Sequence, residues 1–161
     1  MALDNVHFFG NVWLGSEEEA ASKNCNHISI EALKNNYSAV ILAYGAISDR
    51  ELGLAGEHTL KGIMPSRRVV DWYNGSLDCD LNIQKEFNLE QIGHLAIIGN
   101  GNIACDISRM LLKDVNEFNN SDAPTHVLET LRRSKLNSIS MIARRGVTQA
   151  AFTTKEIKEL C

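Results

Sequence analysis

A glycine-rich stretch of the sequence has the residue types and spacing that bind a dinucleotide phosphate. It follows the pattern GxGxxA and consists of Gly99, Asn100, Gly101, Asn102, Ile103 and Ala104. A pyrophosphate must approach backbone N–H groups closely, which favours glycine at the turn, and the start of a helix adds partial positive charge. We therefore expect a nucleotide pyrophosphate to bind here. The alternative is a tight turn between a strand and a helix that binds no ligand.

Two adjacent arginines, Arg144 and Arg145, follow the next apolar stretch of the chain. An NAD-specific Rossmann fold usually has an acidic residue at this point, which hydrogen-bonds the ribose 2′-hydroxyl. A pair of guanidinium groups suits the 2′-phosphate of NADP instead, through charge-assisted bonds. The pair therefore predicts NADP(H) rather than NAD(H). A solvated surface pair without a ligand is the alternative.

Two acidic residues near these groups have structural explanations of their own. Asp106 lies one turn into the expected helix, where it can complement the helix dipole or pair with Arg109 at i, i+3. Glu156 completes a T-x-x-E capping box with Thr153, at the start of a further helix. From the residue types alone, neither acidic residue requires a ligand.

The elements that must position these groups alternate between strands and helices. We expect strands at His94–Ile98 and Ser138–Ala143, and helices at Asn102–Leu112, after Pro124 and after Thr153. This order is typical of an α/β domain with a Rossmann-like parallel sheet. Near the start of the chain we expect a strand within His7–Trp13, a polar connection at Glu17–Asn26, a short helix capped by Ser29 and a buried strand at Asn36–Ala46. Between these elements and His94 we expect a short helix at Ser66–Gly75, which carries the packing residues Trp72 and Tyr73, and then a polar linker at Asp78–Gln91.

Composition excludes several classes of function. The 161 residues are 44% hydrophobic and 22% charged, which suits one globular domain, or one and a piece of another. A net charge of -4 offers no basic surface for nucleic acid, and the apolar runs are too short to span a bilayer, so membrane association is at most peripheral. Neither the histidines nor the cysteines have metal-ligand spacing, and no targeting signal is visible.

From about Phe8 to Leu160 the chain resembles the mitochondrial-type ferredoxin-NADP reductases, the adrenodoxin reductase family. The matching stretches are FFGNV from Phe8, AVILAYGA from Ala39, WYNG from Trp72, IIGNGNIACDISRMLL from Ile97, ARRG from Ala143 and QAAFTTKEIKEL from Gln149. The resemblance implies a flavoprotein with the glutathione-reductase-type two-dinucleotide-binding fold. Such an enzyme transfers electrons from NADPH through FAD to a small acidic [2Fe-2S] ferredoxin, and the family resemblance places it in the mitochondrion.

The resemblance also implies roles for single residues. Asn100 to Ile103 match the pyrophosphate contacts of NADP, and the two arginines match the clamp on its 2′-phosphate. Glu156 matches a further nucleotide contact, Asp106 an aspartate near the flavin on a proton route, and Lys158 a basic position that faces the ferredoxin.

The family's own GxGxxG for FAD, and its glycine-rich segment over the flavin and nicotinamide, do not occur in this sequence. We therefore expect residues 1–46 to be the C-terminal part of a split FAD-binding domain and residues 47–161 to be an NADP-binding domain truncated at its C-terminal side. Such a fragment would bind NADP(H) but not FAD, would be inactive alone, and would expose sheet edges that favour oligomerisation. A glutamate-synthase-like NADPH module and a non-catalytic nucleotide-binding module are the alternatives, although WYNG and AFTTKE speak against the first.

Overall fold

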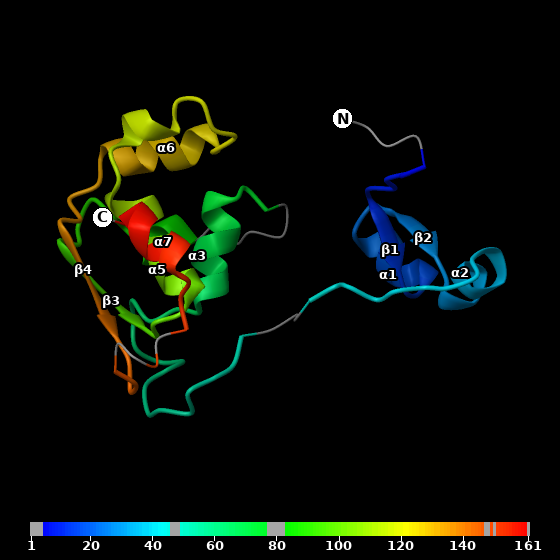
Figure 1. Ribbon diagram of the computed structural model, residues 1–161, viewed down its shortest axis with the longest axis horizontal. Coiled ribbons are helices and arrows are strands. Elements are labelled where there is room, and N and C mark those ends of the chain that lie inside the picture. Colours follow the sequence, from blue (N-terminus) through cyan, green and yellow to red (C-terminus); the bar gives the residue numbers. More distant parts are fainter. Residues whose placement is uncertain (1–4, 46–48, 77–82, 147–148, 150, 161) are drawn as a thin grey trace. The chain divides into compact units, whose positions relative to one another are not determined.

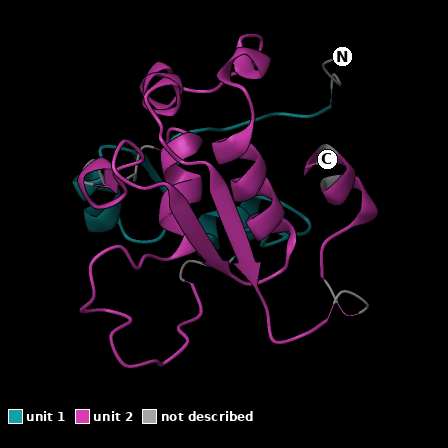
Figure 2. Ribbon diagram, turned by 90° about the vertical axis from the view of Figure 1, so that its left-hand side faces the viewer, with its two compact units in different colours: residues 1–46 teal, residues 47–161 magenta. Residues whose placement is uncertain are grey.

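The computed structural model describes residues 5–45, 49–76, 83–146, 149 and 151–160. The chain forms two compact units, unit 1 (Met1–Ala46) and unit 2 (Ile47–Cys161), which are coloured separately in Figure 2. The assignment of unit 1 to an FAD domain and of unit 2 to an NADP domain stays a prediction.

Unit 1 contains two short strands and two short helices. In chain order these are β1 (Val12–Leu14), α1 (Glu17–Ser22), β2 (Asn26–Ile28) and α2 (Ile30–Asn36) (Figure 1). The strands pair in parallel, with Trp13 opposite His27. The helix α2 begins where the sequence predicted, because the Ser29 side chain accepts a hydrogen bond from the Ala32 N–H.

Three predictions for unit 1 were wrong. Of the residues expected to form a strand at His7–Trp13, only Val12 and Trp13 do so, in β1, and the polar connection expected at Glu17–Asn26 contains α1. The buried strand expected at Asn36–Ala46 does not form, because α2 continues to Asn36 and the following described residues are irregular and, apart from the partly buried Val40, exposed. A parallel strand needs hydrogen-bonding neighbours and cover on both faces. The two-stranded sheet of unit 1 gives this segment neither.

Unit 2 places helices against one face of a parallel sheet. Its elements are α3 (Ser66–Tyr73), α4 (Ile83–Glu86), β3 (His94–Ile98), α5 (Asn102–Leu112), the 3-10 helix η1 (Val115–Phe118), α6 (Thr125–Arg132), β4 (Ser138–Ile142) and α7 (Thr154–Leu160). The strands β3 and β4 lie side by side in parallel, as the sequence predicted (Figures 1 and 2). Leu95, Ile97 and Ile139 point to the core, whereas the alternate residues of both strands are exposed.

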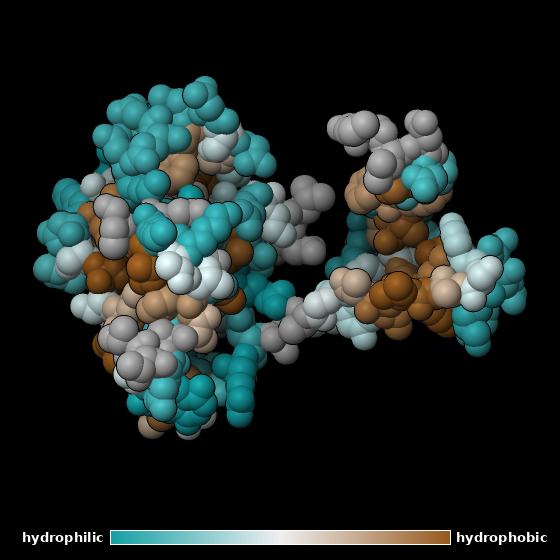
Figure 3. All heavy atoms as spheres, viewed as in Figure 1, coloured by the Kyte–Doolittle hydropathy of each residue, from teal (hydrophilic) through white to brown (hydrophobic). Residues whose placement is uncertain are grey.

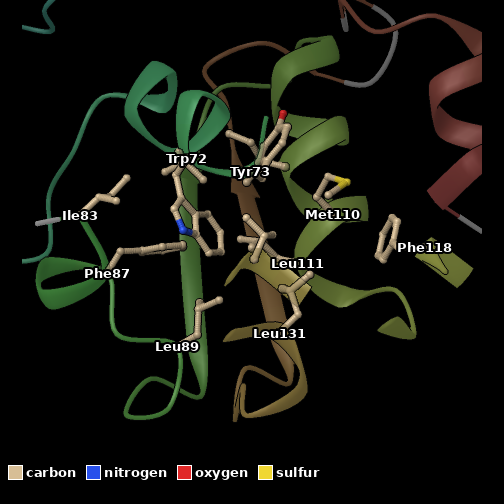
Figure 4. Packing of buried hydrophobic residues seen from close by; sticks show 12 residues of the cluster. Trp72, Tyr73, Ile83, Phe87, Leu89, Met110, Leu111, Phe118 and Leu131 are labelled. Carbon is tan, nitrogen blue, oxygen red and sulfur yellow. The ribbon is translucent and has the colours of Figure 1, made fainter. Parts of the chain in front are cut away.

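The core of unit 2 lies between α3, α5 and the sheet (Figure 4). The ring of Trp72 meets that of Phe87 edge to face, with 6.1 Å between ring centroids. Trp72 and Tyr73 are buried, as their predicted packing role requires. The linker expected at Asp78–Gln91 was wrong over its described part, because Ile83, Phe87 and Leu89 are core residues.

Unit 1 exposes apolar side chains on its surface. The exposed apolar residues of unit 1 include Phe8, Phe9, Ile41 and Leu42. Brown, apolar areas are visible on its surface in Figure 3. Within the described part of the chain, no helix has the length and apolar character needed to cross a membrane.

Candidate nucleotide-binding site

The turn between β3 and α5 has the backbone that its glycines predict. Gly99 has a φ of +137°, in the region that favours glycine. Its N–H donates to the Ile142 carbonyl at 2.8 Å, which ties the turn to the end of β4. A Cβ atom placed on Gly101 would meet no described atom within 4 Å, so the space above this residue is open. Only a residue without a side chain leaves this space free for a ligand.

The helix α5 begins directly after this turn. Ala104 and Cys105 donate the first helical hydrogen bonds, both to the Gly101 carbonyl. The N–H groups of Asn102 and Ile103 precede them and have no helical carbonyl one turn earlier. Because a helix start carries partial positive charge, these groups suit an anionic ligand. The open turn and the helix start together fit the pyrophosphate that the sequence predicted.

The start of α7 is fastened to the same turn. The Ala151 N–H donates to the Asn100 carbonyl at 3.3 Å, and the Thr153 N–H donates to Oδ1 of Asn102 at 3.0 Å. The sequence predicted a capping box in which Glu156 accepts a hydrogen bond from the Thr153 N–H, whereas this N–H donates to Asn102. Glu156 lies in α7, and its side chain is outside the described part. Lys158 is exposed in the last turn of α7. The fold therefore brings the start of α7, the helix that carries Glu156 and Lys158, next to the glycine turn.

The two arginines lie at the same edge of the sheet as the turn. β3 and β4 are parallel, with Ile98 opposite Ile142, so their carboxyl ends meet there. Arg144 and Arg145 follow β4 after one intervening residue, Ala143, and are exposed. In open α/β sheets ligands bind outside the carboxyl ends of the strands. The phosphate-clamp role of the arginines stays a prediction, and their placement agrees with it.

Asp106 is held between two helices. Its Oδ1 accepts a hydrogen bond from Nη2 of Arg109 at 2.5 Å, which is the i, i+3 pair that the sequence allowed. Its Oδ2 accepts a hydrogen bond from the Tyr73 hydroxyl of α3, also at 2.5 Å. Burial and the bonded carboxylate raise the pKa of Tyr73 well above its ordinary value. The phenol therefore stays protonated and acts as the donor.

A cavity of about 510 Å³ adjoins this carboxylate. It is lined by residues of α3, α5 and α7 and of the loop before α3, among them Arg67, Tyr73, Asn102, Ile103, Asp106 and Lys155. The sequence predicted Tyr73 only as a packing residue. Its spacing of 33 residues from Asp106 carries no signal, because only the packing of α3 on α5 brings the two together. The flavin-proximal role of Asp106 stays a prediction.

The described residues form no cluster of metal-ligating side chains. No group of three or more histidine, cysteine, aspartate or glutamate side chains gathers among them. The two described cysteines, Cys25 and Cys105, are not in disulfides.

Comparison with known proteins identifies similar sequences over nearly the whole chain. The NADPH:adrenodoxin oxidoreductase of Arabidopsis thaliana, named as mitochondrial, is 39% identical over 157 residues, or 98% of this chain. The mitochondrial enzyme of Drosophila melanogaster is 34% identical over 96% of the chain, and the NADPH-ferredoxin reductase FprA of Mycobacterium tuberculosis is 36% identical over 95%. The chain spans about 30% of the length of these relatives. No family model matches the chain.

Solved structures show the same relationship. FprA in complex with NADPH superimposes with a TM-score of 0.68 at 37% identity, covering 83% of this chain and 28% of FprA. The His57Gln mutant of FprA gives a TM-score of 0.67 at 33% identity, over 89% of this chain and 33% of the other. The resemblance to the adrenodoxin reductase family is confirmed, and the α/β fold with parallel strands agrees with a Rossmann-like unit.

Proposed function

We propose that this chain is the NADP(H)-binding part of an FAD-dependent reductase of the adrenodoxin reductase family. The observation that carries the proposal is the glycine turn at the start of α5, with Arg144 and Arg145 at the same sheet edge. The complex of FprA with NADPH, 37% identical over 83% of this chain, supports it.

Each group in this arrangement has a separate task. The pyrophosphate lies over Gly101 and accepts hydrogen bonds from the first N–H groups of α5. Arg144 and Arg145 pair with the 2′-phosphate, which distinguishes NADP(H) from NAD(H). Glu156 contacts the nucleotide from α7. The chain binds and orients the cofactor, and these steps require no redox change within the protein.

The complete reductase has the glutathione-reductase-type fold with two dinucleotide-binding domains. Unit 1 is then the C-terminal part of a split FAD domain and unit 2 most of the NADP domain. FAD in the complete protein supplies the change from two-electron to one-electron transfer. In the complete reductase, Lys158 faces a small acidic [2Fe-2S] ferredoxin and Asp106 lies near the flavin. The complete protein is mitochondrial. The 161-residue chain alone binds NADP(H), does not hold FAD and does not reduce ferredoxin.

The phosphate clamp is tested by titrating the chain with NADPH and NADH by calorimetry. We expect tighter binding of NADPH, and a loss of roughly 100-fold in NADPH affinity when Arg144→Ala and Arg145→Ala are combined, because two charge-assisted contacts are lost. Raising the salt concentration should weaken binding by the wild type. A matched control is Arg132→Ala with Lys135→Ala. These exposed residues lie at the end of α6 and shortly after it, where the Lys135 N–H donates to the Leu89 carbonyl before the amino end of β3. The control therefore removes two positive charges near the amino ends of the strands, whereas Arg144 and Arg145 follow the carboxyl end of β4.

Two results would overturn the proposal. Equal affinity for NADPH and NADH, or no loss in the double arginine variant, would remove the phosphate clamp. A purified chain that carries the visible absorption of bound flavin would contradict the claim that it holds no FAD.

A further inference from the structure

The contact between Tyr73 and Asp106 places a fixed carboxylate on the wall of the cavity beside α5. The Tyr73 ring is buried in the core, and Figure 4 shows its hydroxyl oxygen at the border of the cluster, away from the other labelled side chains. The hydroxyl holds Oδ2 of Asp106 from α3, and Arg109 holds Oδ1 from within α5. Because both oxygens are held, the carboxylate plane has one orientation.

The held carboxylate can still accept hydrogen bonds from a ligand. Each carboxylate oxygen has two lone pairs, and the contacts with Tyr73 and Arg109 use one on each oxygen. The Asp106 side chain is 37% exposed. The cavity wall also carries Asp49, Arg67, Asp71 and Lys155, a mixture of charges that suits polar but uncharged groups.

The cavity adjoins the start of α5, and neither of the two arginines lines it. Asn102 and Ile103, the predicted pyrophosphate contacts, line it, whereas none of its lining residues comes from β4. A dinucleotide with its 2′-phosphate at Arg144 and its pyrophosphate at the turn has its remaining half nearest to Asp106. That half carries ribose hydroxyl groups and a carboxamide, which donate hydrogen bonds.

We propose that Tyr73 is a positioning residue that holds Asp106 as an oriented acceptor for the nicotinamide-ribose half of NADP(H). This inference rests on the function proposed above. Tyr73 does not touch the ligand, and it acts through the direction in which the Asp106 oxygens face. Tyr73 also links the core of unit 2 to the ligand, because its ring packs in the core and its hydroxyl orients the carboxylate that binds the ligand.

The test compares two ligands that share the adenosine 2′-phosphate, of which only one has the half that reaches the cavity. NADPH carries the nicotinamide and its ribose, whereas 2′,5′-ADP carries the adenosine with its 2′- and 5′-phosphates and lacks the second phosphate, the ribose and the nicotinamide of the other half. With Tyr73→Phe in the 161-residue chain we expect NADPH affinity to fall about three- to tenfold, in the range of one ordinary hydrogen bond. The affinity for 2′,5′-ADP should not change. Tyr37→Phe, at an exposed tyrosine in unit 1, is the matched control.

Two further variants test whether Tyr73 acts through Asp106. Asp106→Asn should lower NADPH affinity and spare 2′,5′-ADP, and its combination with Tyr73→Phe should add little more, since the two residues form one unit. Asp106→Glu keeps the charge but moves the carboxylate away from the hydroxyl, so it should reproduce the loss seen with Tyr73→Phe. This variant provides the test if Tyr73→Phe fails to fold by circular dichroism.

Each remaining outcome has a definite meaning. An unchanged NADPH affinity, an equal loss for both ligands, or additive losses in the double variant would overturn the positioning role while the proposed function stands. A wild-type chain that binds neither ligand would overturn the proposed function, and the positioning role with it.

Discussion

Unit 2 buries a core, whereas unit 1 is held together by contacts between residues that are close in sequence. The unit 2 cluster that includes Trp72 and Leu89 has members no more than 8% exposed. Among the described residues of unit 1, Ala20 is the one hydrophobic residue in the buried class. Phe8 and Ile41 in unit 1 are 92% and 89% exposed. The difference follows from the layers: helices cover one sheet face in unit 2, and no comparable layer closes a core within unit 1.

The structure of unit 1 depends on a small network around Glu19. The Glu19 N–H donates to the Ser16 side chain, and one Glu19 carboxylate oxygen accepts from the Ser16 N–H and from the Trp13 indole. The Lys23 ammonium lies 4.8 Å from the centre of the Trp13 ring. Exposed contacts of this kind stabilise a turn of helix but do not replace apolar burial. We infer that the two units have different stabilities and that the candidate site is on the more stable one.

The largest expected effect is a loss of the unit 2 core. Leu89→Ala should lower the free energy of unfolding of unit 2 by about 2–5 kcal/mol, because this fully buried side chain would leave a cavity. Urea unfolding followed by the Trp72 indole signal in NMR measures the loss. Ile41→Ala in unit 1 removes a similar side chain from an exposed position and is the control. Comparable losses in both variants would contradict the contrast between the units.

A smaller effect is expected at the start of α1. Ser16→Ala should destabilise this helix by about 1 kcal/mol, the usual contribution of a serine N-cap. Hydrogen exchange of the α1 amides measures it, and the amides of α5 should not change. Ser29→Ala, which removes the cap of α2, separates an effect of one cap from a general loosening of unit 1. Slower or unchanged exchange in α1 would show that the cap does not control this helix.

Acid should loosen unit 1 through the same glutamate. The Ser16 N–H, and then the Trp13 indole, lower the pKa of Glu19 below its ordinary value of 4.5. The fold therefore favours the charged form, so this contribution is fully present above about pH 4.5. It is lost as the pH falls through the lowered value. The Trp13 indole signal in NMR should then shift while that of Trp72 stays, and Glu19→Gln should remove the pH dependence. A Trp13 signal that does not respond to acid would contradict this prediction.

The smallest effect on stability is expected at the exposed apolar residues of unit 1. Phe8→Ser with Ile41→Ser should change the free energy of unfolding by less than about 0.5 kcal/mol, because neither side chain is buried. The same change should reduce self-association, since the sequence predicts that exposed apolar surface favours oligomers. Analytical ultracentrifugation measures it. A wild-type chain that is already a single monomeric species would contradict the expected oligomerisation.

Local patterns in the sequence predicted the elements around the site. The β3 strand, the glycine turn and α5 could be read from one continuous stretch, because each depends on neighbours in sequence: apolar runs, glycine at the turn and the period of an amphipathic helix. The strand β4 could be placed in the same way, and parallel pairing then put Arg144 and the turn at one edge.

The errors occurred where structure depends on distant partners. Ile83 and Leu89 were assigned to a polar linker because they are isolated apolar residues, and only contact with Trp72 and its neighbours makes them core. The segment after Asn36 has the apolar run of a buried strand, but a strand forms only beside another one. The apolar composition favoured a strand there, but the two-stranded sheet of unit 1 offers this segment no neighbouring strand.

The sequence by itself determined the candidate ligand. The spacing of Gly99 and Gly101 predicts a dinucleotide, and Arg144 and Arg145 predict that it carries a 2′-phosphate. Only the tertiary structure decided how Asp106 is held. Tyr73 comes from a helix 33 residues earlier, and the 2.5 Å bond exists because α3 and α5 share one core. A motif can record which groups a ligand needs, but the orientation of a side chain depends on packing between segments that local sequence does not connect.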